Sequence, residues 1–125
     1  MHKSKLAGFI IDCETEDLEA AAEFWGSALG MDLHYFDDQQ ASNYVKLVDP
    51  DNNMHIEVQS VDHPSRVHLD IETDDIDAEV ERLKGLGAKE VSRIKRWCVM
   101  EAPTGQRFCV VRKCTANFDA KAHQW

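Results

Sequence analysis

The sequence contains two copies of one pattern, in which a short apolar strand is followed by a helix and then by three strand-like segments. The first copy starts at residues 9–12 (FIID), and the second starts about 58 residues later, at residues 67–70 (VHLD). In both copies, apolar residues at helical spacing lead to a Leu-Gly pair, at residues 29–30 and 86–87. Because one supersecondary unit occurs twice, we predict a pseudo-twofold domain with a cavity between matching sheets.

Chain length limits the domain organisation. A chain of 125 residues is long enough for one core and too short for a second independent one. We therefore predict a single domain, with module one at about residues 5–61 and module two at about residues 65–113. We expect Phe24 and Trp25 to lie in the core. The tail, residues 114–125, has no clear period, and three alternatives stay open: a docked arm, a partner surface or a frayed end.

Charge and composition exclude several classes of partner. The formal net charge is −9, so nucleic acid and anionic membranes would be repelled. No stretch approaches the roughly 20 apolar residues of a membrane span, and the N-terminus lacks the apolar core of a signal peptide. The four cysteines form no C-x-x-C pair, which favours reduced thiols. We expect a cytoplasmic protein that binds neither nucleic acid nor membrane.

Four short segments carry a family resemblance: residues 24–31 (FWGSALGM), 67–71 (VHLDI), 86–88 (LGA) and 102–109 (APTGQRFC). Their order and spacing resemble the vicinal oxygen chelate superfamily, which contains glyoxalase I, extradiol dioxygenases and the bleomycin-resistance proteins. The four segments look like those of a glyoxalase-like subgroup, and the match covers about residues 6–112. The resemblance implies an α+β fold of two βαβββ modules, with curved mixed sheets around a shared ligand cavity and helices packed outside. It also implies a homodimer.

The resemblance further implies a divalent metal, held at four equivalent positions on the first and last strand of each repeat. His68 and Glu57 match two of these positions. Ile10 takes a third and cannot bind a metal, and Cys109 replaces the usual carboxylate at the fourth. His68, Glu57 and Cys109 are thus the candidate metal ligands. Such a set suits zinc better than magnesium or manganese, and we expect neither of the latter to be tightly bound.

Strand alternation assigns these side chains to faces. His68 alternates with apolar neighbours, so it projects to the opposite face together with Asp70. By repeat equivalence Asp12 shares that face, and Ile10, Asp12, Asp70 and Arg107 are the candidate residues of the ligand cavity. His68 and Glu57 are the candidate catalytic residues for proton transfer. The alternatives are a half-exposed strand with ordinary polar residues, and a Cys109 that is only a small buried hydrophobe.

Two functions follow from this reading. The first is a glyoxalase-like lyase or isomerase, in which Glu57 or His68 moves a proton on a small organic molecule. The second is a non-catalytic protein that binds or sequesters a small molecule, as resistance proteins do. The incomplete ligand set favours the second, whereas the retained His68 and Glu57 favour the first. The acidic charge favours a neutral or cationic ligand in both cases.

Overall fold

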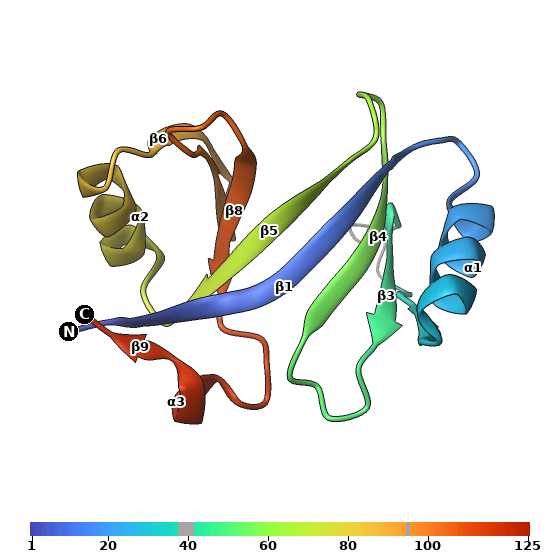
Figure 1. Cartoon of the computed structure of the whole chain (residues 1–125), viewed down its shortest axis with the longest axis horizontal. Helices are drawn as coiled ribbons and strands as arrows, with labels where there is room; N and C mark the ends of the chain where they lie inside the picture. Colours follow the sequence, from blue (N-terminus) through green and yellow to red (C-terminus); the bar gives the residue numbers. More distant parts are fainter. Residues whose placement is uncertain (38–41, 95) are drawn as a thin grey trace. The chain divides into compact units, whose positions relative to one another are not determined.

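The computed structural model describes residues 1–37, 42–94 and 96–125, and shows an α+β chain. Its order confirms the predicted repeat of strand, helix and three strands (Figure 1). No helix among the described residues is long and apolar enough to cross a membrane. The elements are β1 (Lys3–Glu14), α1 (Leu18–Leu29), β2 (Asp32–Tyr35), β3 (Tyr44–Val48), β4 (His55–Val61), β5 (Arg66–Thr73), α2 (Ile76–Gly85), β6 (Lys89–Ile94), β7 (Trp97–Glu101), β8 (Arg107–Arg112), α3 (Phe118–Lys121) and β9 (His123–Gln124).

The chain divides into two compact units. One comprises residues 9–67, and the other combines residues 1–8 with residues 68–125, so β1 contributes to both. The first unit has the strand order β2-β3-β4-β1. The second has the order β5-β8-β7-β6, in which β5 and β8 are parallel and the remaining pairs are antiparallel. The sheet is therefore mixed, as predicted, while the module boundaries given above stay a prediction.

The core of the first unit lies between α1 and its strands. The Asp17 side chain caps the helix by accepting a hydrogen bond from the backbone N–H of Ala20, and Gly30 ends it with a φ of 68°. Trp25 packs against the buried cluster, as predicted. Phe24 does not: it lies one helical step from Trp25, about 100° around the axis, and is 62% exposed. The members of the cluster are Ile11, Leu47, Ile56 and Val58.

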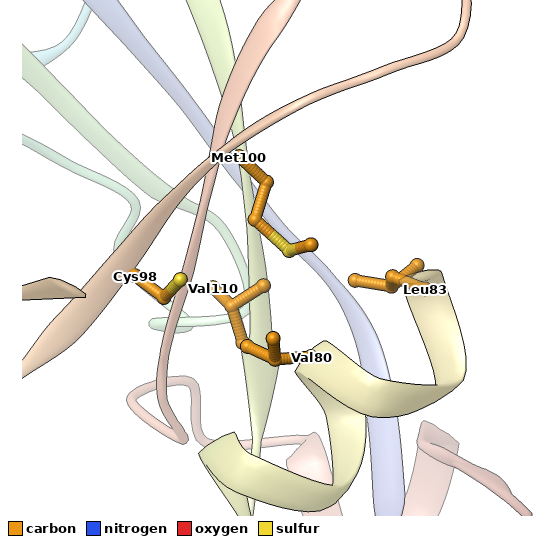
Figure 2. Packing of buried hydrophobic residues seen from close by; sticks show 5 residues of the cluster. All are labelled: Val80, Leu83, Cys98, Met100 and Val110. Carbon is orange, nitrogen blue, oxygen red and sulfur yellow. The ribbon is translucent and has the colours of Figure 1, made fainter. Parts of the chain in front are cut away.

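The core of the second unit joins α2 to β7 and β8. Val80 and Leu83 of the helix meet Cys98, Met100 and Val110 of the two strands (Figure 2). Burial raises the pKa of the Cys98 thiol, so this cysteine is an inert part of the core. The side chains that alternate with the buried ones on these strands consequently point away from α2.

The C-terminal tail is a docked arm, which decides among the three alternatives. Strand β9 pairs with β1, and Figure 1 shows the two chain ends next to each other. The indole Nε1 of Trp125 donates a hydrogen bond to Ser4 Oγ at 2.8 Å, and the guanidinium of Arg82 lies 3.8 Å from the centre of the Trp125 ring. Phe118 is 2% exposed. The arm thus closes the second unit with apolar, polar and cation–π contacts.

A buried carboxylate anchors the start of this arm. Glu72 of β5 is fully buried and accepts hydrogen bonds from the backbone N–H groups of Cys114 and Thr115 and from the Thr115 hydroxyl. The ammonium of Lys5 lies 3.1 Å from the same carboxylate. Burial alone raises the pKa of Glu72, but the donors around it outweigh burial and hold the pKa below the ordinary value of 4.5.

The lowered pKa of Glu72 predicts an acid-sensitive arm. A carboxyl whose pKa is lower in the folded state contributes stability above the ordinary pKa of 4.5, and loses it as the pH falls through the folded-state pKa. Glu72→Gln should therefore lower the free energy of unfolding at pH 7, and its effect should shrink as the pH falls below 4.5 through the folded-state pKa. Urea unfolding across this range checks the result. Glu81→Gln, on the exposed side of α2, is the control. A Glu72→Gln variant that loses the same free energy of unfolding at pH 7 and at the acid end of the range would contradict the account.

Candidate functional site

The candidate site lies on the face of β5 and β8 that points away from α2. Ile71 of β5 packs on the core under α2, so His68 and Asp70, which alternate with it, project to the other face. The parallel pairing of β5 and β8 sets Asp70 directly opposite Cys109. One nitrogen, one oxygen and one sulfur atom of these three side chains lie within 4.8 Å of one another. Two adjacent strands thus bring three different donor atoms to one point.

Asp70 is the unusual member of this cluster. The residue is 4% exposed, and its Oδ1 receives no hydrogen bond from the described residues. The ionisable side chain recorded next to this oxygen is His68, whose Nε2 lies at 3.5 Å, which is longer than a good hydrogen bond. A buried carboxylate oxygen without a donor is costly, and each such group requires a physical explanation. A bound cation or ligand that pairs with Asp70 is one explanation.

The donor set fits zinc. Zinc accepts imidazole nitrogen, carboxylate oxygen and thiolate sulfur, and catalytic zinc sites use three protein ligands and leave a further position open. Magnesium and manganese favour oxygen-rich sites, which the His68, Asp70 and Cys109 set does not provide. The structure therefore joins two of the predicted ligands, His68 and Cys109, with Asp70, which the sequence assigned to the cavity instead. The shared strand face of His68 and Asp70 was the available signal for this role.

The other predicted ligand, Glu57, belongs to the first unit. It lies on β4 on the face opposite the core residues Ile56 and Val58, as strand alternation predicts. Its carboxylate is 3.2 Å from His55 Nε2, and 14% of its side chain is exposed. Glu57 is therefore a half-buried carboxylate with a neighbouring imidazole.

The remaining predicted cavity residues occupy different environments. In the first unit, Ile10 and Asp12 are each 2% exposed, and the Asp12 carboxylate lies 3.7 Å from the guanidinium of Arg66. In the second unit, Arg107 lies two residues before Cys109 on β8 and pairs with Glu101 at 3.3 Å. Ile10 thus provides an apolar surface, and the charge of Arg107 is partly offset by its partner.

Comparisons with known proteins identify a family that matches this chain. The family model described as "Glyoxalase-like domain" matches residues 8–111. Methylmalonyl-CoA epimerase from Mycobacterium tuberculosis is similar in structure with a TM-score of 0.63 and 18% identity, over 93% of this chain and 91% of the epimerase. A hypothetical protein from Bacillus halodurans gives a TM-score of 0.64 and 13% identity, over 88% of this chain and 94% of that protein.

A third similar structure is a variant of homoprotocatechuate 2,3-dioxygenase from B. fuscum. Its TM-score is 0.59 and its identity 18%, over 89% of this chain and 32% of the dioxygenase chain. At these identities the likeness shows the fold alone. A search of curated protein sequences finds no match. The family model covers most of the chain, so this protein belongs to the glyoxalase-like domain family, within the vicinal oxygen chelate superfamily.

Proposed function

We propose that this protein is an isomerase- or lyase-type enzyme for a small organic molecule, with zinc held by His68, Asp70 and Cys109. The observation that carries the proposal is the buried Asp70 oxygen that no described residue pairs by hydrogen bonding, next to an imidazole and a thiol. The family supports small-molecule chemistry, and the names of several similar structures describe an epimerase.

The three residues of the cluster would contribute different charges to a bound metal ion. Asp70 and Cys109, as carboxylate and thiolate, supply the negative charge that a dication needs, while His68 donates a neutral nitrogen. Bound zinc would polarise a substrate oxygen and stabilise negative charge that develops on it. The burial of Asp70 keeps water from its carboxylate, which strengthens electrostatic interactions at that atom. Strands β5 and β8 hold all three side chains on regular backbone, so their positions are fixed before substrate arrives.

Charge also bears on the substrate. The chain carries a net charge of −9, and the nearest cation on the same face of β8, Arg107, is already paired with Glu101. A neutral or cationic carbonyl compound therefore suits the protein better than a polyanion such as the coenzyme A ester named for the epimerase. The free state of all four cysteines supports a reducing, cytoplasmic location.

The competing function is non-catalytic binding or sequestration. It is supported by Ile10, a buried apolar residue at a position where the family resemblance implies a ligand. Binding of a small molecule without turnover or metal would establish this alternative. The homodimer implied by the family is a further proposal, and light scattering on the purified protein measures it.

Cobalt substitution tests the proposed metal site without any knowledge of the substrate. Metal-free protein should bind one equivalent of Co²⁺ and show the visible bands of a tetrahedral site together with a thiolate-to-cobalt charge-transfer band. Cys109→Ser should abolish the charge-transfer band, because the thiolate is lost. Cys114→Ser is the matched control, since Cys114 is an exposed free cysteine outside the cluster, and should leave the spectrum unchanged. Failure to bind Co²⁺ or Zn²⁺ would refute the proposal.

Stability of the metal-free protein separates a functional Asp70 from a structural one. Asp70→Asn removes a buried charge that has few partners, so the free energy of unfolding in chelator should stay equal or rise by about 1 kcal/mol. Glu72→Gln, on the same strand, removes a buried charge that is fully hydrogen-bonded and should cost about 1–3 kcal/mol or more. Urea unfolding at pH 7 gives both values. Equal losses for the two variants would make Asp70 a structural residue.

The predicted proton-transfer role of Glu57 is tested separately. Deuterium incorporation next to a carbonyl group, followed by NMR in D₂O, is measured for a panel of small ketones, aldehydes and esters, with methylmalonyl-CoA for comparison. Glu57→Gln should lower the exchange rate about 100-fold or more, the usual contribution of a general base, and leave the metal content unchanged. Glu23→Gln, on α1, is a control for the change in net charge. Undiminished exchange in Glu57→Gln would exclude the role.

A further inference from the structure

The second unit contains a cavity that none of the candidate site residues lines. It has a volume of about 530 Å³, within the range of small-molecule sites. It lies where the C-terminal ends of β5 and β8 meet the start of α2 and the adjoining ends of β6 and β7. The lining residues are Thr73, Asp74, Asp75, Ile76, Asp77, Arg93, Ile94, Trp97, Arg112 and Lys113.

The acidic side chains of this cavity are already engaged. Asp75 caps α2 by accepting a hydrogen bond from the backbone N–H of Ala78, at 3.0 Å. Asp74 accepts one from the backbone N–H of Lys3, at 2.9 Å. Asp77 pairs with the guanidinium of Arg93, at 2.8 Å. Each of the three carboxylates thus already has a partner within the protein, so none of them is the group expected to bind a ligand.

One of the basic side chains is not engaged. Arg93 is held by Asp77 and by Glu90, and the ammonium of Lys113 lies 3.6 Å from Asp119. The side chain of Arg112, by contrast, forms no hydrogen bond or ion pair with the described residues, although the residue lines the cavity. Its guanidinium is therefore the cationic group of the lining that remains available to a bound molecule.

The rest of the lining suggests the shape of that molecule. A guanidinium presents a planar pair of N–H donors that matches the two oxygens of a carboxylate. Ile76 lines the same cavity from the start of α2 and is half-buried, so it offers an apolar surface on the α2 side of the sheet, where the parity of Val110 also places Arg112. We propose that this cavity binds a small organic carboxylate with an apolar body, with its carboxylate on Arg112 and its body against Ile76. The proposal does not depend on the metal cluster or on the proposed enzyme activity.

Phenylacetate is a suitable probe, because it combines one carboxylate with one planar apolar ring. Benzyl alcohol and phenethylamine keep the ring and replace the carboxylate with a neutral and a cationic group. Titrations are followed by backbone amide NMR on metal-free full-length protein, so that a carboxylate cannot bind through zinc. Phenylacetate should bind more tightly than both other compounds and shift amide signals of β8, of the start of β7 and of the start of α2.

Variants connect the binding to Arg112. Arg112→Gln should weaken phenylacetate binding about 10-fold or more, the effect of losing a charge-assisted hydrogen-bond pair, and Arg112→Lys should give an intermediate loss because the charge stays without the planar fork. Arg96→Gln, which removes the same charge next to Trp97 from a residue outside the lining, should bind as the native protein does. The thermal midpoint of each variant shows that it is folded.

Three results would overturn the proposal. The first is equal or tighter binding of phenethylamine or benzyl alcohol. The second is unchanged phenylacetate affinity in folded Arg112→Gln. The third is a set of amide shifts centred on His68, Asp70 and Cys109, which would place the carboxylate at the metal cluster and leave the cavity without a ligand.

Discussion

The site depends on the alternation of side chains along β5 and β8. One set of residues, including Ile71 and Val110, packs under α2 and forms the core of the second unit. The alternate set, including His68, Asp70 and Cys109, is thereby forced to the opposite face. A shift of one residue in either strand would place polar donors in the core and apolar groups at the site, so burial on one face fixes the chemistry on the other.

The buried carboxylates of the second unit show what distinguishes a site from a structural feature. Glu72 receives hydrogen bonds from the tail, and Glu79 of α2 pairs with Arg82 and His2 at 2.7 Å each. In both, the surrounding donors outweigh burial and hold the pKa below its ordinary value. These two carboxylates therefore stabilise the arm and the start of β1. Asp70 is nearly as buried, but its Oδ1 lacks such a set of donors among the described residues, which is the cost expected of the ligand-binding role proposed for it.

The proposed metal cluster and the cavity lie in different parts of the same unit. The cluster occupies the middle of β5 and β8, where regular pairing fixes side-chain positions. The cavity occupies the ends of the strands, where loops and the start of α2 leave space. The first position suits the proposed metal ligation, and the second suits the proposed binding of a small carboxylate. Both sites rely on the same mixed sheet, because the parallel β5–β8 pair supplies His68 and Asp70 to one and Thr73 and Arg112 to the other.

The sequence by itself determined the repeat, the order of the elements within the two copies and the strand face of His68 and Asp70, because apolar spacing and turn residues are local signals. It also selected His68 and Cys109. It placed Phe24 in the core wrongly. Phe24 and Trp25 are adjacent on α1, and only the packing of the helix on its strands decides which of the two is buried. Tertiary structure decided the parallel β5–β8 register that sets Asp70 opposite Cys109, the docking of the C-terminal arm and the cavity at Arg112. Each of these joins residues far apart in sequence, and no local pattern encodes such contacts.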